Sequence, residues 1–312
     1  MGIVAGLVVL LYRVLLEYAG RGMNLVLEYA RKYPALLGGW FLALFVLACI
    51  VGKLVKFEPM ISGSGIPQVE GEIMGKLDQV WWKVLPAKFL GGFLSLFSGL
   101  SLGREGPSIQ IGAMAGKAVS KALKREKTEE RYLLTCGASA GLAAAFHAPL
   151  AGVLFSLEEI HKNFSVSVLV SVMTASITAD YISGEFLGFT SVFQFDIGQE
   201  VAPRYYWHIV ILGVLLGVMG AFYNKMTIWV QGLYFKAKGL NETTRLLIPF
   251  LLAGVLGLLL PEVLGSGHGL IDMAARGNMV LQSLAVLFAV KFLFSLICFG
   301  SGAPGGIFFP LL

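Results

Sequence analysis

The chain has 312 residues, of which 56% are hydrophobic and only 14% are charged. Soluble domains carry about 25% charged residues, so this chain lacks the polar side chains needed to cover a water-facing surface. The net charge of +5 is small and no basic run is interleaved with aromatic residues, which argues against a nucleic-acid partner. Together with a mean hydropathy of +0.77, these values predict an integral membrane protein that crosses the bilayer several times.

Long apolar runs are the first sign of membrane spans. A bilayer core of about 30 Å requires about 20 apolar residues in a helix. The first run lacks the basic leader and the small-residue cleavage site of a signal peptide, so it is interpreted as the remainder of a membrane helix. The charged residues at 21–32 then predict an aqueous loop. The predicted spans are 1–16, 35–55, 164–182, 209–230 and 246–260.

The segment 61–67 reads ISGSGIP and predicts a glycine-serine turn followed by a helix. Taken alone, such a turn is typical of a protein surface. Trp81 and Trp82 are interpreted as an interfacial aromatic anchor, and Lys83 and Lys88 as flanks of the next apolar run.

The stretch Gly103-Arg104-Glu105-Gly106-Pro107-Ser108 places two ionisable side chains between apolar runs. An ionisable group at membrane depth costs at least about 2.5–3.5 kcal/mol and is normally retained for a purpose. Pro107 fits the first position of a helix, where its missing N–H has no cost. The free N–H groups of that helix would point back toward Glu105 and attract an anion. The sequence therefore predicts a carboxylate beside an anion site.

The next two segments have opposite characters. The segment 117–131 holds many charges of both signs, so it predicts an aqueous loop and leaves the orientation in the membrane open. The segment 133–157 is rich in glycine and alanine, which allow helices to pack closely. Within it, His147 is interpreted as a helix-end residue before Pro149. The adjacent carboxylates Glu158 and Glu159, considered without other motifs, are typical of a solvated helix end.

The tail repeats landmarks of the first half at nearly constant spacing. Gly265-Ser266-Gly267 follows Gly63-Ser64-Gly65 by 202 residues, whereas Lys291-Phe292-Leu293 follows Lys88-Phe89-Leu90 by 203. Pro310 follows Pro107 by the same 203. The common spacing predicts a duplication. Transporters with two such halves often bind their substrate where broken helices meet near the midplane.

The duplication predicts how the chain is organised. Residues 1–195 are predicted to form the first transmembrane repeat, whose start is interpreted as clipped, and residues 196–312 an incomplete second repeat. No CBS pair or other soluble domain is expected. A counterpart of Glu159 would lie near position 362, so the sequence is interpreted as a fragment of a longer protein.

These motifs resemble those of the CLC family of chloride channels and proton-coupled chloride transporters. The resemblance rests on three segments in the family order: GSGIP at 63–67, GREGP at 103–107 and GIFFP at 306–310. It implies an all-α membrane protein with the CLC-type inverted-repeat helical bundle, in which broken helices meet at a midplane anion site.

The resemblance also implies roles for single residues. Glu105 corresponds to the external gate and Glu159 to the internal proton acceptor found in exchangers. The implied anion-binding positions are Ser64, Gly65, Arg104, Gly106, Ile307 and Phe308. The expected ligands are chloride and protons, without a cofactor or a metal site. A homodimer in a bacterial cell membrane is expected from the family.

Three functions stay open on the sequence. The two glutamates favour chloride/proton exchange. A passive chloride channel is the first alternative, and an inactive or assembly-only fragment is the second. An enzyme is not expected, because GREGP lacks the lysine of a P-loop and no Ser/His/Asp set occurs at meaningful spacing.

Overall fold

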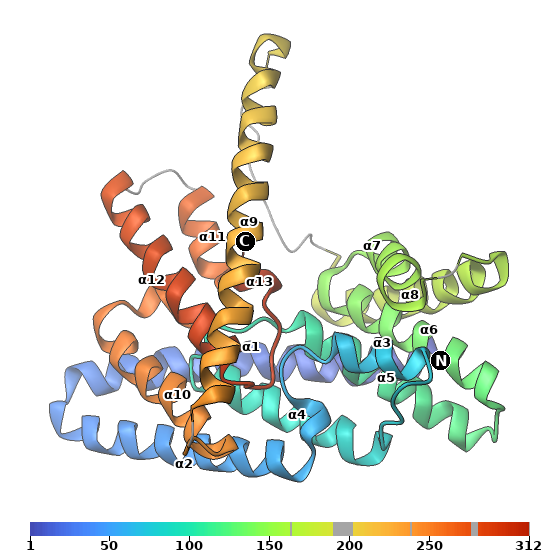
Figure 1. Cartoon of the computed structure of the whole chain (residues 1–312), viewed down its shortest axis with the longest axis horizontal. Coiled ribbons are helices and arrows are strands. Elements are labelled where there is room, and N and C mark those ends of the chain that lie inside the picture. The colour runs from blue at the N-terminus through green and yellow to red at the C-terminus, as the bar shows by residue number, and fades with distance from the viewer. Residues whose placement is uncertain (163, 190–201, 238, 276–279, 312) are drawn as a thin grey trace.

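The structure is a computed structural model that describes the chain except residues 163, 190–201, 238, 276–279 and 312. The described part is built from helices, and its one bridge between extended residues joins Gly103 to Gly306. Figure 1 gives the arrangement of the elements. In chain order they are α1 (Gly2–Lys32), η1 (Pro34–Leu36), α2 (Leu37–Phe57), η2 (Pro59–Ile61), α3 (Ile66–Ile73), α4 (Trp81–Phe97), α5 (Glu105–Ala122), α6 (Lys127–Phe146), α7 (Pro149–Phe155), η3 (Ser156–His161), α8 (Val166–Leu187), η4 (Pro203–Tyr205), α9 (Tyr206–Lys236), α10 (Glu242–Leu259), η5 (Pro261–Val263), α11 (His268–Ala275), α12 (Leu281–Gly300) and α13 (Phe308–Leu311).

Six of the described helices are long and apolar enough to cross a membrane, namely α1, α2, α8, α9 with η4, α10 and α12. The loop expected at 21–32 is wrong, because α1 continues to Lys32. Its second half buries Ala19, Met23, Leu27 and Ala30, which recur every three or four residues. One face of the helix therefore stays apolar while the charged side chains lie on the other.

The helices α5 and α6 pack with their backbones almost in contact. A Cβ atom added to Gly112 would lie against the carbonyl oxygen of Gly137 and 3.0 Å from the Cα atom of Gly141. A Cβ on Gly116 or Gly141 would meet the backbone of the facing helix in the same way. The close packing predicted from the small residues of 133–157 is therefore present along α6.

The helix that follows the GREGP stretch begins at Glu105, two residues before the predicted start at Pro107. Pro107 then occupies the third helical position. The first four N–H groups of a helix have no partner within it, so a proline is tolerated there as well. This shift makes Glu105 the first residue of α5, with its side chain at the helix end.

The aqueous loop predicted at 117–131 is mostly wrong. The helix α5 runs to Ala122 and α6 begins at Lys127, so the connection is 123–126. Lys117 is buried and bonds to the carboxylates of Glu72 and Asp78. The sequence shows how many charged residues this segment contains, but it does not show which of them form ion pairs in the folded protein.

Elements of the two halves correspond in order and length. The helices α1 and α9 have 31 residues each, and α3 and α11 have eight each. The short turns η2 and η5 precede the matching Gly-Ser-Gly loops, and α13 begins where α5 begins in the first half. The predicted boundary between residues 195 and 196 lies outside the described residues, so the division into two repeats stays a prediction.

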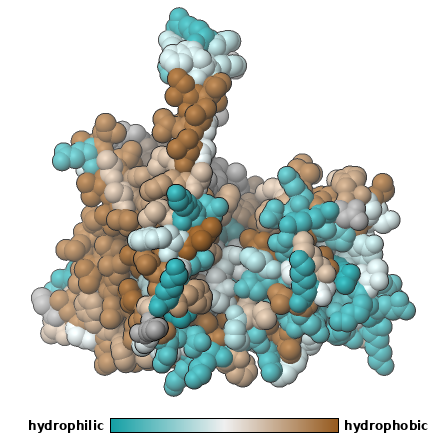
Figure 2. Space-filling view, viewed as in Figure 1, coloured by the Kyte–Doolittle hydropathy of each residue, from teal (hydrophilic) through white to brown (hydrophobic). Residues whose placement is uncertain are grey.

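The helix α9 projects from the rest of the molecule (Figure 1). None of its most apolar window is buried, whereas half of the corresponding window of α1 is. Figure 2 shows that the projecting part is hydrophobic along its shaft and more polar at its free end.

Candidate anion and proton site

The loops of the two halves meet through backbone hydrogen bonds. Gly103 and Gly306 each donate an N–H to the carbonyl oxygen of the other, both at 2.7 Å. The amide of Gly63 donates to the carbonyl of Gly302 at 3.3 Å, and the amide of Gly305 donates back to Gly63 at 3.0 Å. Consequently, the helix starts of α3, α5 and α13 lie around one point.

The carboxylate of Glu105 lies at this meeting point. Its Oε1 atom accepts the backbone N–H of Phe309 at 3.1 Å, across 204 positions of the sequence. A Cβ atom on either Gly103 or Gly306 would collide with its Oε2 atom, so both glycines leave room for the carboxylate. Oε2 itself is buried and has no hydrogen-bond partner among the described residues. The carboxyl group of Glu105 thus accepts a backbone N–H at the start of α13, the kind of place that binds an anion.

The predicted residues Ser64, Gly65 and Gly106 lie together. Gly106 packs on Ser64, since a Cβ atom there would be 2.6 Å from the Ser64 carbonyl oxygen. The hydroxyl of Ser64 accepts the N–H of Ile66 at 3.3 Å, at the first turn of α3. Gly65 has a φ angle of +92°, a conformation that L residues with side chains rarely adopt.

Phe308 is the first residue of α13 and Ile307 precedes it, and the amide that reaches Glu105 belongs to the next residue, Phe309. No pattern in the sequence indicates that Phe309 donates this hydrogen bond, because the choice of amide depends on the rotation of a short helix against the other half. Phe308 is exposed and Ile307 half-buried.

Arg104 and a cluster of aromatic rings border the site. The guanidinium of Arg104 lies 5.7 Å from the centre of the Phe309 ring. Phe146, at the end of α6, stacks on Phe309 with ring centres 5.3 Å apart and meets Phe308 edge to face at 5.6 Å. The side chain of Arg104 is therefore held against the residue whose amide bonds to Glu105.

Two buried lysines hold the Gly-Ser-Gly loops, and sequence reasoning missed this role. The ammonium of Lys88 donates to the carbonyls of Ile61 and Gly63 at 2.8 and 2.6 Å. Lys291 donates in the same way to Val263 and Gly265 at 3.0 and 2.7 Å. Lys88, which the sequence places at the flank of an apolar run, has a fully buried side chain. The shared spacing of the lysines and loops was a signal that could have revealed the pairing.

A polar network supports the first loop from α5. The amide nitrogen of Gln110 donates to the carbonyl of Met60 at 2.8 Å and to Oε1 of Gln79 at 2.7 Å. Gln79 in turn donates to Glu72 at 2.9 Å, and Glu72 pairs with Lys117. The network ends at Asp78, an exposed residue whose pKa is lowered by its hydrogen bond to Lys117.

Three carboxylates of this region approach one another. One oxygen each from Glu72, Asp78 and Glu130 lie within 4.8 Å of each other. Lys117 bonds to the first two, and Lys121 lies 2.7 Å from Glu130. Because ammonium groups already neutralise these acids, the arrangement is an ion-pair network rather than a cation site.

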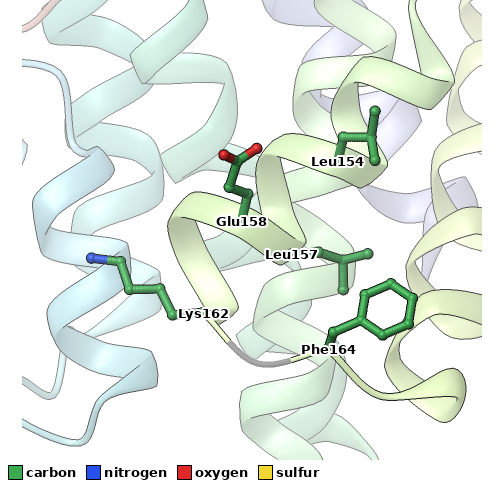
Figure 3. A pocket seen from close by; sticks show the side chains of 5 residues that line it. All are labelled: Leu154, Leu157, Glu158, Lys162 and Phe164. Atoms are coloured by element: carbon green, nitrogen blue, oxygen red, sulfur yellow. The ribbon is translucent and has the colours of Figure 1, made fainter.

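Glu159 lies apart from Glu105, in the wide turn η3 that continues α7, and its side chain is exposed. Nearby, Lys162 pairs with Glu70 of α3. The neighbouring carboxylate, Glu158, lines a pocket of about 380 Å³. Figure 3 shows Glu158 and Lys162 on one side of this pocket and Leu154, Leu157 and Phe164 on the other.

Broken helices whose ends meet at a buried carboxylate, within a bundle that has several candidate spans, define a class of membrane transporters. The sequence matches the family described as voltage gated chloride channel over residues 43–312. The chain therefore belongs to the CLC family, and it is an integral, multi-pass membrane protein.

Solved structures agree with this assignment. A slow cyanobacterial Cl⁻/H⁺ antiporter is 33% identical, with a TM-score of 0.86 over 99% of this chain and 75% of its own. A CLC-type fluoride/proton antiporter is 19% identical with a TM-score of 0.78, over 99% of this chain and 77% of its own. A eukaryotic CLC transporter is 20% identical with a TM-score of 0.74, over 99% and 57%. The predicted all-α CLC fold is confirmed.

Proposed function

We propose that this protein exchanges chloride for protons, with Glu105 as the gate and Glu159 as the proton acceptor on the opposite side. The observation that carries the proposal is the hydrogen bond from the Phe309 amide to the Glu105 carboxylate. A carboxylate and a chloride ion compete for the same backbone N–H donors, because both are anions. Protonation of Glu105 removes its charge and weakens its hold on these donors, which leaves the place to chloride.

The same competition couples the two ions. Glu105 leaves the anion site in its protonated form when chloride takes its place. The movement of chloride therefore requires the movement of a proton. Glu159 lies at the far end of the α7–η3 helix and is exposed, which suits a residue that collects protons from water. Ser64, Gly65, Arg104, Gly106, Ile307 and Phe308 are proposed to line the path of the anion, and no cofactor is required. The likeness to a cyanobacterial Cl⁻/H⁺ antiporter supports exchange and a bacterial cell membrane.

A homodimer is part of the proposal. The helices α7 and α8 expose large apolar side chains on the surface of the molecule. These are Leu150, Leu154, Val166, Val170, Ile177 and Tyr181. A second copy of the chain that packs on these residues would remove them from lipid.

The test is chloride flux with simultaneous pH recording in proteoliposomes. In the unmutated protein, chloride efflux is expected to drive proton uptake. Glu159→Gln is expected to retain chloride flux and lose proton movement, and Glu105→Gln is expected to lose coupling as well. The matched control is Glu158→Gln, which changes the adjacent carboxylate and should leave coupling intact.

Two results would contradict the proposal. Chloride flux without proton movement in the unmutated protein would establish a passive channel. Absence of any flux, from protein that is folded and inserted, would favour an inactive or assembly-only chain.

A further inference from the structure

The break between α6 and α7 contains a histidine with an acidic partner. His147 ends α6 in the left-handed conformation, with φ of +53°, and its backbone N–H donates to Ala143 at 2.9 Å. Its side chain is 6% exposed, and its Nδ1 atom lies 3.2 Å from Oδ1 of Asp180 on α8. The predicted position at a helix end is correct, and Asp180 is a carboxylate partner that a helix end does not require.

The hydrogen bond fixes which nitrogen carries the proton in the neutral ring. Because a carboxylate accepts, Nδ1 must donate, and Nε2 is then the nitrogen with a free lone pair. Nε2 is buried and has no hydrogen-bond partner in the described part of the chain. A neutral imidazole oriented by a carboxylate, with an unpartnered nitrogen, is suited to take up and release a proton.

A chain of contacts connects the neighbourhood of His147 with Glu105. Phe146, the preceding residue, stacks on Phe309, whose amide bonds to the Glu105 carboxylate. Arg13 of α1 donates to the carbonyl of Ala144 at 3.2 Å, one helical turn from the imidazole. Glu159 lies at the other end of α7–η3, about 15 Å along the helix from Pro149. His147, at the end of α6, therefore lies just before the start of α7–η3, and Glu159 lies near the other end of α7–η3.

The charges around His147 come from three elements. Arg13 on α1, Arg104 before α5 and Asp180 on α8 all act on the imidazole, and Glu17 pairs with Arg13 at 3.6 Å. The two arginines balance Glu17 and Asp180. One negative charge then remains, that of Glu105, which also interacts with Arg104. The net charge of these residues together is therefore zero when one proton is bound, either to Glu105 or to His147.

We propose that the His147–Asp180 pair is a second proton-exchange site, which serves Glu105 on the side away from Glu159. The inference rests on the proposed exchange function. A proton that leaves the Glu105 carboxylate passes through water to Nε2, so that an O–H bond breaks and an N–H bond forms. The imidazolium, stabilised by Asp180, then releases this proton to the solution.

The first experiment follows the histidine nitrogens by ¹⁵N NMR in the purified, detergent-solubilised chain. The chain has four histidines, so the spectrum is simple, and His147→Asn assigns the signal. Asparagine is suited to this variant because it tolerates the left-handed conformation and can still donate to Asp180. His147 is expected to be protonated on Nδ1 at neutral pH.

The decisive comparison is with Glu105→Gln. Glu105→Gln removes a negative charge that would favour protonated His147. The titration of His147 is therefore expected to move by about one pH unit or more to lower pH. Asp180→Asn should move it in the same direction and change the ring tautomer. An unchanged titration in Glu105→Gln, or a proton on Nε2 at neutral pH, would overturn the inference.

Transport provides an independent measure. The pH is varied on one side of the membrane only, and His147→Asn is expected to remove the step that the titration of this histidine adds to proton-coupled flux. His208→Asn, at an exposed histidine of α9, is the matched control and should retain the step. A retained step in His147→Asn would also contradict the inference. If instead Glu105→Gln leaves coupling unchanged, the proposed function itself is wrong.

Discussion

At the scale of single residues, Lys88 shows how a polar side chain of the site can be buried: backbone carbonyl groups accept its hydrogen bonds. Lys88 has no carboxylate among its bonded partners in the described chain, yet its three-donor ammonium satisfies two carbonyls of the Gly-Ser-Gly loop. One lysine therefore shapes the loop that carries Ser64.

At this scale we predict that Lys88→Met destabilises the protein by about 1–3 kcal/mol, because two buried carbonyls lose their donor. The measurement is thermal unfolding of the purified protein in detergent. Lys83→Met is the control, since Lys83 lies beside Trp82 near the start of α4 and has no such carbonyls to satisfy. Equal stability of the two variants would show that the loop keeps its shape without Lys88.

At the scale of elements, the contact of α5 with α6 is set by glycines. The two helices have almost no side chain between them at Gly112 and Gly137, where each glycine faces the carbonyl of the other. Since α5 begins with Glu105 and α6 ends beside His147, the spacing of these helices also sets the position of both titratable groups.

Gly112→Ala is predicted to separate the helices and to destabilise the protein by about 1–3 kcal/mol, the usual cost of overpacking. Gly213→Ala on α9 is the matched control, because a Cβ atom there meets nothing within 4 Å. The midpoint of thermal unfolding should fall for the first variant and change little for the second. A stable Gly112→Ala protein would mean that α6 can shift without penalty.

At the scale of the whole molecule, the two halves are joined at their loops. Besides the pair Gly103 and Gly306, the amide of Gly265 donates to the carbonyl of Gly99 at 3.0 Å, much as Gly63 donates to Gly302. These crossed hydrogen bonds are 2.7–3.3 Å long, and the Gly103–Gly306 pair is buried. The two halves are therefore expected to open together.

Hydrogen exchange followed by mass spectrometry tests this expectation. Peptides that contain Gly63, Gly103 and Gly306 should show slow exchange and should become labelled together as denaturant is added. Peptides from the ends of α9 provide the contrast. If the segment with Gly306 exchanges rapidly while that with Gly103 stays protected, the halves open independently.

The sequence by itself determined the class of protein, the family and the residues of the carboxylate and its glycines. A chain with so few charged residues cannot cover its surface for contact with water, which indicates a bilayer. The spacing of the repeated motifs can be read directly from the sequence. It also located Glu105 and Glu159 as the glutamates to examine, although their roles stay proposals.

Only the tertiary structure decided which groups meet. The bond of Phe309 to Glu105 depends on how α13 is rotated, and the pairing of Lys88 with its loop depends on the position of α4. The partner of His147 is 33 residues away on another helix. Local patterns report the character of a residue, whereas contacts across the chain arise from the packing of whole helices, which no short pattern encodes.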